Sequence, residues 1–225
     1  MATHQTIAGF SDAELLQRMV DTHGERFHAG FWALVAQEVM PRLPAQPVVV
    51  DLGCGPGLFL RDLLQRYPHV RGYGYDVTPA MIAHAQQLGC GPQVTFAVHD
   101  VTAQPLPLAP ASVDLVCMTA VLHLFDDPFA VLAEATRLLH PGGLLLLYDW
   151  IRRPLATYLA ERLEGEGEAR LASRQRWLRL FPVHNKYTSD DWQWLLAEAR
   201  FSVLCSARLR PHFEVFVATP QPASK

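Results

Sequence analysis

Two spacings of apolar residues alternate along the middle of the chain. Short apolar runs are typical of strands buried on both faces, and they predict strands at residues 48–50, 70–75, 94–98, 113–118 and 144–148. Apolar residues at helical spacing predict helices at 58–67, 79–88 and 128–139, the last closed by the turn from His140 to Gly143. Repeated strand–helix units of this kind build an α/β fold, an open doubly wound sheet with helices on both faces.

The two flanks have a different pattern. Before the alternation, helices are predicted at 11–20, where Ser11 and Glu14 form a capping-box pattern, and at 31–40, which ends before a proline. After it, residues 152–186 are a helical stretch rich in Arg, Glu and Leu, interrupted by a charged glycine break at 164–168. A helix from Thr188 or Ser189 to Arg200 and a hairpin of strands at 201–207 and 212–218 complete the chain.

We expect one domain over 1–225. Its parts are a helical N-terminal cap (1–46), a cofactor-binding core (47–151), a lid-like helical segment (152–186) and a C-terminal helix and hairpin (187–225). The 225 residues are half hydrophobic and 18% charged, which is enough apolar material for one sizeable core.

Charge and cysteine usage exclude several classes. A net charge of -3 gives no general attraction to phosphate backbones, so nucleic acid is not an expected partner. The arginines between 170 and 179 are interpreted as a solvated helix face. Four separated cysteines without a CxxC pair, and ten histidines without an HExxH motif, predict neither a disulfide framework nor a metal site. No apolar run is long enough for a membrane span and Met1–Phe10 does not resemble a leader, so a cytoplasmic location is expected.

The segment from Val48 to Gly57, VVVDLGCGPG, joins a buried strand to a helix through a glycine-rich turn. Ligands of open α/β sheets bind beyond the carboxyl ends of strands, and glycines let a ligand approach the backbone closely. A nicotinamide dinucleotide site would need a further glycine where Leu58 stands, and Pro56 removes a backbone donor. The turn therefore favours a nucleoside-sized pocket over a dinucleotide fingerprint.

Two further strands also end in an acid, at Asp76 and at Asp100. A carboxylate at the end of the second strand can accept hydrogen bonds from both hydroxyls of a ribose. One at the end of the third strand can accept from an adenine amino group. Acids at three successive strand ends, counting Asp51, point to an adenosine-containing ligand.

The successive motifs VVVDLGCGPG, YGYDVTPAMIAHA, HDVTAQPLPL, VDLVCMTAVLHLFDDP and LLHPGGLLLLYD resemble those of class I S-adenosylmethionine-dependent methyltransferases over residues 47–150. The resemblance implies a Rossmann-like seven-stranded sheet, mostly parallel with an antiparallel last strand. It also implies S-adenosylmethionine as cofactor and S-adenosylhomocysteine as product. The implied cofactor-binding residues are Asp51, Gly53, Cys54, Gly55 and Gly57 for the methionine part, Asp76 for the ribose, Val77, Met81, Asp100 and Val101 around the adenine, and Thr119 beside the amino group.

The chemistry needs few protein groups, because a sulfonium methyl is already an activated electrophile that direct in-line displacement can transfer. A general base is required only for a protonated nucleophile, and His123 and Asp149 are the candidates. A purely structural role for His123 stays open. For the acceptor we expect a pocket formed by Phe31, Trp32, Trp150, His184 and Tyr187.

The sequence thus predicts a methyltransferase that acts on a small-molecule acceptor, as a monomer or homodimer. Attack from carbon, nitrogen, oxygen or sulfur is compatible with these residues. The alternatives are a nicotinamide-dependent oxidoreductase and a catalytically silent S-adenosylmethionine-binding protein on the same fold.

Overall fold

A single seven-stranded sheet organises the computed structural model, which describes residues 11–222 and leaves Met1–Phe10 and residues 223–225 undescribed. The strand order is β3-β2-β1-β4-β5-β7-β6. The strands are β1 Val48–Leu52, β2 Arg71–Asp76, β3 Val94–Val98, β4 Val113–Thr119, β5 Leu139–Trp150, β6 Phe201–Arg210 and β7 Phe213–Pro220. Strands β1 to β5 are parallel, and β7 pairs antiparallel with β5 and β6. The predicted α/β fold with its antiparallel last strand is confirmed.

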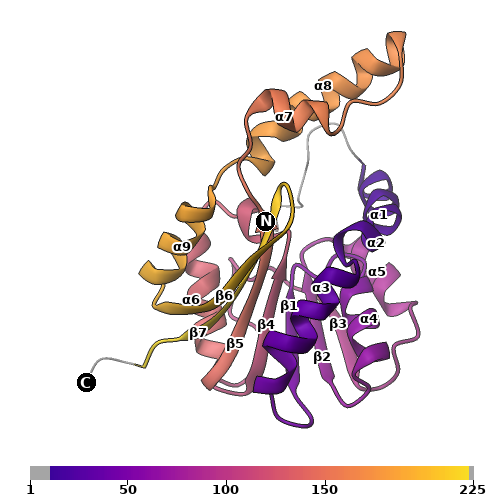
Figure 1. Ribbon diagram of the computed structural model, residues 1–225. Helices are drawn as coiled ribbons and strands as arrows, with labels where there is room; N and C mark the ends of the chain where they lie inside the picture. The colour runs from indigo at the N-terminus through magenta and orange to yellow at the C-terminus, as the bar shows by residue number, and fades with distance from the viewer. Residues whose placement is uncertain (1–10, 223–225) are drawn as a thin grey trace.

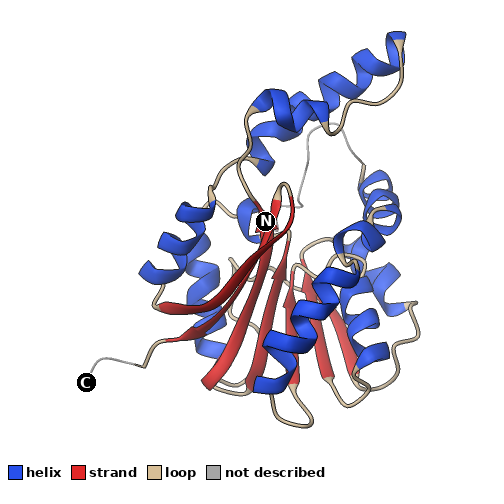
Figure 2. Ribbon diagram, in the orientation of Figure 1, coloured by secondary structure: helices blue, strands red, loops and turns tan. Residues whose placement is uncertain are grey.

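Helices cover both faces of the sheet (Figures 1 and 2). Helices α3 (Ala29–Leu34), α4 (Leu58–Arg66) and α5 (Pro79–Gln86) bury apolar side chains against one face. Helices α6 (Pro128–Leu138) and α9 (Ser189–Glu198) do so against the other. This two-sided burial is what the continuous apolar runs of the central strands predict, because such strands have no solvated face.

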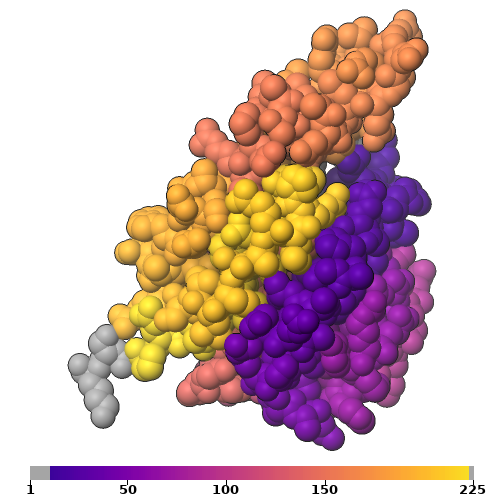
Figure 3. Space-filling model, viewed as in Figure 1, coloured from indigo at the N-terminus to yellow at the C-terminus, as the bar shows by residue number. Residues whose placement is uncertain are grey.

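The remaining helices gather at the carboxyl ends of the parallel strands (Figure 1). They are α1 (Asp12–Asp21), α2 (His23–Arg26), α7 (Leu155–Ala160) and α8 (Gly167–His184). The last two share a small core of Tyr158, Trp177 and Leu180. In Figure 3 the segments containing α1 and α2 lie beside the β6–β7 hairpin, and an ion pair of 3.2 Å between Arg210 and Glu25 joins them. None of the helices in the described part of the chain is long and apolar enough to cross a membrane.

Most predicted bounds shift by at most three residues, and two elements differ further. The helix predicted at 31–40 is α-helical only to Leu34, then continues as a π-turn (Val35–Val39) and a 3-10 turn (Met40–Arg42). Pro41 has no amide hydrogen and its ring crowds the preceding turn, so the α-helical pattern cannot reach it. The turn predicted from His140 to Gly143 is instead the irregular start of β5, whose register with β4 shifts between Val113 and Leu115.

The four arginines at 170, 174, 176 and 179 are all exposed on α8, as a solvated helix face requires.

The position of Gly57 between the turn and α4 gives a prediction about stability. Gly57 has φ of +78°, and a Cβ there would lie 2.7 Å from the Ala85 Cβ and 2.9 Å from Phe96. Gly142 has φ of +89° but no atom within 4 Å of such a Cβ, so it is the matched control. We expect Gly142→Ala to lower the free energy of unfolding by about 1 kcal/mol, and Gly57→Ala by about 2–4 kcal/mol because overpacking adds to the backbone strain. Urea unfolding measures both, and equal losses would contradict this reading of the packing.

Candidate active site

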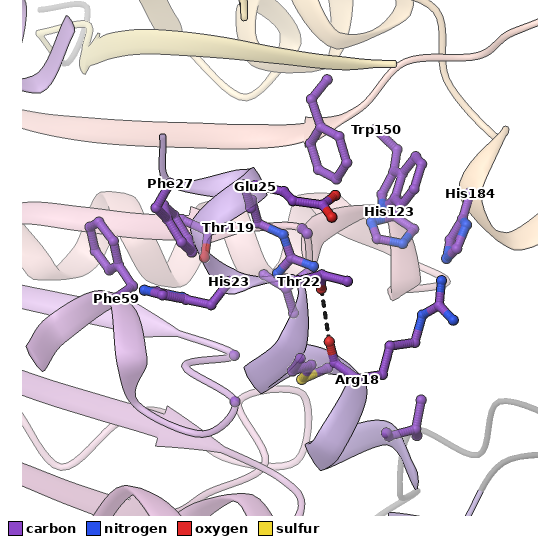
Figure 4. A pocket seen from close by; sticks show the side chains of 18 of the residues that line it. Arg18, Thr22, His23, Glu25, Phe27, Phe59, Thr119, His123, Trp150 and His184 are labelled. Atoms are coloured by element: carbon purple, nitrogen blue, oxygen red, sulfur yellow. Dashed lines mark hydrogen bonds between the residues drawn. The ribbon is translucent and has the colours of Figure 1, made fainter. Parts of the chain in front are cut away.

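A cavity of about 290 Å³ opens at the carboxyl ends of β1, β2 and β4, beneath α1, α2 and the α7–α8 segment (Figure 4). The topology puts it there, because parallel strands paired in register end at the same edge of the sheet. The sequence-predicted residues that line it are Gly53, Cys54, Gly55, Asp76, Thr119, His123, Trp150 and His184.

The glycine turn is fixed to the end of the neighbouring strand. The Tyr75 carbonyl accepts hydrogen bonds from the amides of Gly53 (2.7 Å) and Cys54 (3.0 Å). Gly53 and Gly55 have φ of +68° and +52°, a conformation that glycine adopts without a steric penalty. The turn thus presents backbone rather than side chains to the cavity.

Asp76 lies where the ribose-binding acid is expected. Its two carboxylate oxygens accept hydrogen bonds from the amides of Gly55 (2.9 Å) and Thr78 (2.8 Å). Burial raises the pKa of Asp76, although these hydrogen bonds oppose the shift. Each oxygen keeps a lone pair free, so the carboxylate can accept two further hydrogen bonds from a ribose.

Asp51 lies fully buried at the end of β1 and does not line the cavity. Neither of its carboxylate oxygens has a hydrogen-bond partner among the described residues. Burial, together with the charge of Asp76, raises the pKa of Asp51 well above its usual range. An unpartnered acid next to the glycine turn fits a site that receives the cationic end of a ligand, as the resemblance implies for the methionine part of the cofactor.

The other expected cofactor residues lie outside the cavity. Met81 is buried in α5, and the Asp100 carboxylate accepts hydrogen bonds from the amide (2.9 Å) and hydroxyl (2.6 Å) of Thr102. Gly57, Val77 and Val101 do not line the cavity either. On this side the α1 residue Met19 lies against the turn, since a Cβ on Gly55 would be 3.3 Å from its sulfur.

His123 and Asp149 form a buried pair beside the cavity. One Asp149 oxygen lies 2.7 Å from His123 Nδ1, and the other accepts from the His123 amide at 3.2 Å. The Trp150 amide also donates to Asp149, at 2.7 Å. When the His123 imidazole is neutral, this carboxylate favours the tautomer with the hydrogen on Nδ1, which leaves a lone pair on Nε2. This is the arrangement that a general base requires.

An aromatic stack forms one wall of the cavity. The Trp150 ring lies between His184, 4.0 Å away by ring centroids, and His212, 4.9 Å away. Burial, with the nearby charges of His123 and Arg162, lowers the pKa of His184 well below its usual value, and the Tyr158 hydroxyl lies 3.0 Å from its Nδ1. A Glu161 oxygen lies 3.3 Å from His212 Nδ1, yet burial and nearby guanidiniums lower the pKa of His212 to about 3. Both imidazoles are therefore neutral at pH 7.

Three residues expected to bind the acceptor do not line the cavity. Phe31 and Trp32 pack with Phe27 and Phe59 in the core between α3, α4 and the sheet, and Tyr187 packs against Trp192. Apolar spacing cannot separate a core aromatic from one that lines a cavity, because both face inward.

Sequence reasoning missed the cationic residues of the cavity, which are Arg18, Arg26, Arg162 and Arg210. They come from four separate segments, so no local motif contains them. The one available signal was in α1, where Leu15, Arg18 and Thr22 follow helical spacing and share the face that lines the cavity.

Comparisons with known proteins agree with the fold. The family model described as "Methyltransferase domain" matches residues 50–147. The malonyl-[acyl-carrier protein] O-methyltransferase of Hahella chejuensis is 39% identical over 98 residues, which are 44% of this chain and 34% of that protein. The trans-aconitate 2-methyltransferase of Azoarcus sp. is 38% identical over 114 residues, 50% of this chain and 43% of that protein. The chain thus spans less than half the length of these two relatives.

Solved structures share the architecture. A SAM-dependent methyltransferase from Aquifex aeolicus aligns with a TM-score of 0.68 at 18% identity, covering 93% of this chain and 98% of that one. Human N-acetylserotonin methyltransferase in complex with SAM aligns with a TM-score of 0.64 at 21% identity, covering 93% of this chain and 56% of that one. Residues 50–147 thus match the methyltransferase-domain family, and the seven-stranded fold that contains them is the one shared by class I S-adenosylmethionine-dependent methyltransferases.

Proposed function

We propose that the chain transfers a methyl group from S-adenosylmethionine to a small-molecule acceptor by direct in-line displacement. The observation that carries this is one cavity in which the glycine turn and Asp76 meet the buried pair of His123 and Asp149. Relatives named for malonyl and trans-aconitate acceptors support a small acceptor group.

In this proposal the residues at the strand ends hold the cofactor. Asp76 accepts the ribose hydroxyls, while the Gly53–Gly57 backbone, Asp51 and Thr119 hold the methionine part. Val77, Met81, Asp100 and Val101 surround the adenine. Because the cavity stops short of these last four residues, cofactor binding would have to open the contact between α1 and α5.

When bound, S-adenosylmethionine supplies a methyl group already activated by the sulfonium charge, so no covalent enzyme intermediate is needed. His123 Nε2 accepts the proton of a protonated nucleophile, and Asp149 positions the imidazole and stabilises its protonated form. Residues 152–186, which contain α7 and α8, act as a lid that keeps water from the reacting atoms.

The direct test measures S-adenosylhomocysteine binding by calorimetry and then the transfer of radiolabelled methyl groups into a metabolite extract. We expect binding, and label incorporated into a small molecule. Binding of NAD(H) without S-adenosylhomocysteine would indicate the oxidoreductase alternative. Cofactor binding without transfer to any acceptor would indicate a catalytically silent protein.

A first prediction concerns Asp51. The pKa of Asp51 is raised in the folded protein, so folding favours the protonated carboxyl. The free energy of unfolding is therefore greatest below the unfolded-state pKa of about 4, and it falls as the pH rises from there through the folded-state pKa. We expect Asp51→Asn to raise the free energy of unfolding of the ligand-free protein by at least about 1 kcal/mol at pH 7. The same variant should bind S-adenosylmethionine about tenfold more weakly or worse.

Urea unfolding with and without the cofactor measures both effects. The control is Glu134→Gln, because hydrogen bonds from Arg137 and Leu106 lower the pKa of Glu134 despite its burial and its neutralisation should be destabilising. A loss of stability in Asp51→Asn, or unchanged cofactor affinity, would contradict the assignment.

A second prediction concerns His123. We expect His123→Asn and His123→Gln to lower kcat with the acceptor recovered from the extract by about 10²- to 10⁴-fold, the usual contribution of a general base. Affinity for S-adenosylhomocysteine should change less than threefold. His69→Gln, at an exposed position outside the cavity, is the control. Wild-type turnover in both variants at saturating acceptor would show that His123 is structural.

A further inference from the structure

Four guanidinium groups reach the cavity from four parts of the chain. Arg18 is on α1, Arg26 ends α2, Arg162 follows α7 and Arg210 ends β6. Burial is the first cause that lowers the pKa of Arg18, Arg26 and Arg162, so these cations have lost water around them. Such a cluster is costly unless anions compensate it.

The protein's own carboxylates compensate only part of this charge. Arg210 pairs with Glu25 at 3.2 Å, and Arg162 pairs with Glu161 at 3.3 Å. Glu161 is shared, since it also lies 3.9 Å from Arg153. Within residues 11–222, Arg18 and Arg26 form no ion pair, and Glu164 acts on Arg18 only at longer range.

The cofactor would not remove the imbalance. S-adenosylmethionine carries one carboxylate against an ammonium and a sulfonium, so at most one guanidinium finds its anion there. The neutral state of His184 and His212 agrees with a positive potential. After burial, the charges that oppose protonation are those of His123 and then Arg162 for His184, and that of Arg162 first for His212. In Figure 4 the Arg18 side chain extends toward His184.

We propose, resting on the function above, that the methyl acceptor carries a carboxylate and that Arg18 and Arg162 bind it on the lid side of the cavity. Both guanidiniums lie near one indole, with the Cζ atoms of Arg18 and Arg162 at 4.4 Å and 5.6 Å from the Trp177 ring centroid. The Arg162 guanidinium is fixed in position, since it donates a hydrogen bond to the Tyr158 carbonyl at 3.0 Å and its Cζ lies 4.1 Å from the Tyr158 ring centroid. A planar guanidinium matches the geometry of a carboxylate.

The cavity wall next to these arginines indicates the chemistry of the rest of the acceptor. Trp150, Trp177 and Leu180 present aromatic and apolar surface to the same cavity, and the rings of His123 and His184 are 5.8 Å apart at its side. An acceptor that places an apolar or aromatic body on this wall and an acid group against the arginines satisfies both features. A neutral acceptor leaves Arg18 without an ion pair among residues 11–222 and leaves Arg162 with only the shared Glu161. The substrate class is therefore a small apolar or aromatic carboxylic acid.

The test measures binding to protein saturated with S-adenosylhomocysteine. The probes are cinnamate, 4-hydroxybenzoate and hexanoate, each paired with its primary amide, and calorimetry gives the dissociation constants. We expect at least one acid to bind about tenfold or more tightly than its amide. Arg18→Gln should weaken binding of that acid about tenfold and leave binding of its amide unchanged. Arg18→Lys should retain part of the preference for the acid over the amide.

Arg66→Gln is the matched control, because the Arg66 guanidinium also lies over a tryptophan ring, 4.1 Å from the centroid of Trp32, but outside the cavity. It should leave acid binding unchanged. Equal binding of every acid and its amide, or an equal effect of Arg18→Gln on both, overturns the proposal. Absent S-adenosylhomocysteine binding would instead refute the proposed function, and the two failures are therefore distinguishable.

Discussion

The site depends on how the glycine turn is attached to β2. Tyr75 ends the backbone pairing of β2 with β1, and its carbonyl then accepts both the Gly53 and the Cys54 amides. This pair of hydrogen bonds sets the turn against Asp76, whose carboxylate in turn accepts from Gly55. The backbone wall and the acid expected to bind ribose are therefore positioned by one network.

A second constraint is the charge that the fold buries around this network. Among residues 11–222, Asp51 has no hydrogen-bond partner, and the Arg18 and Arg26 guanidiniums of the cavity form no ion pair. Each of these buried charges lowers the stability of the ligand-free protein, and a ligand group of opposite charge would offset that cost. A cofactor with a cationic sulfonium end and an acceptor with an acid group would fit these two regions separately. Stability and function are then opposed at the same residues.

The sequence predicted the elements whose signal is local. Strand β3 has the predicted bounds, and the Ser11 capping box begins α1 as expected. The glycine turn and the strand-end acid Asp76 were also predicted, because sheet topology places them at one edge. What the sequence could not predict depends on long-range packing. Phe31 is a core residue rather than part of a pocket wall, and Arg18 and Arg162 come near one ring only because Trp177 of α8 lies within reach of both.

If this edge of the sheet binds an adenosyl sulfonium compound, a crystal structure of the full chain with S-adenosylhomocysteine will show where each part of the ligand lies. We predict ribose hydroxyls within hydrogen-bond distance of Asp76 and the homocysteine part along the Gly53–Gly55 backbone, with α1 moved away from Gly55. A ligand bound elsewhere, or a ribose that does not contact Asp76, would contradict the account.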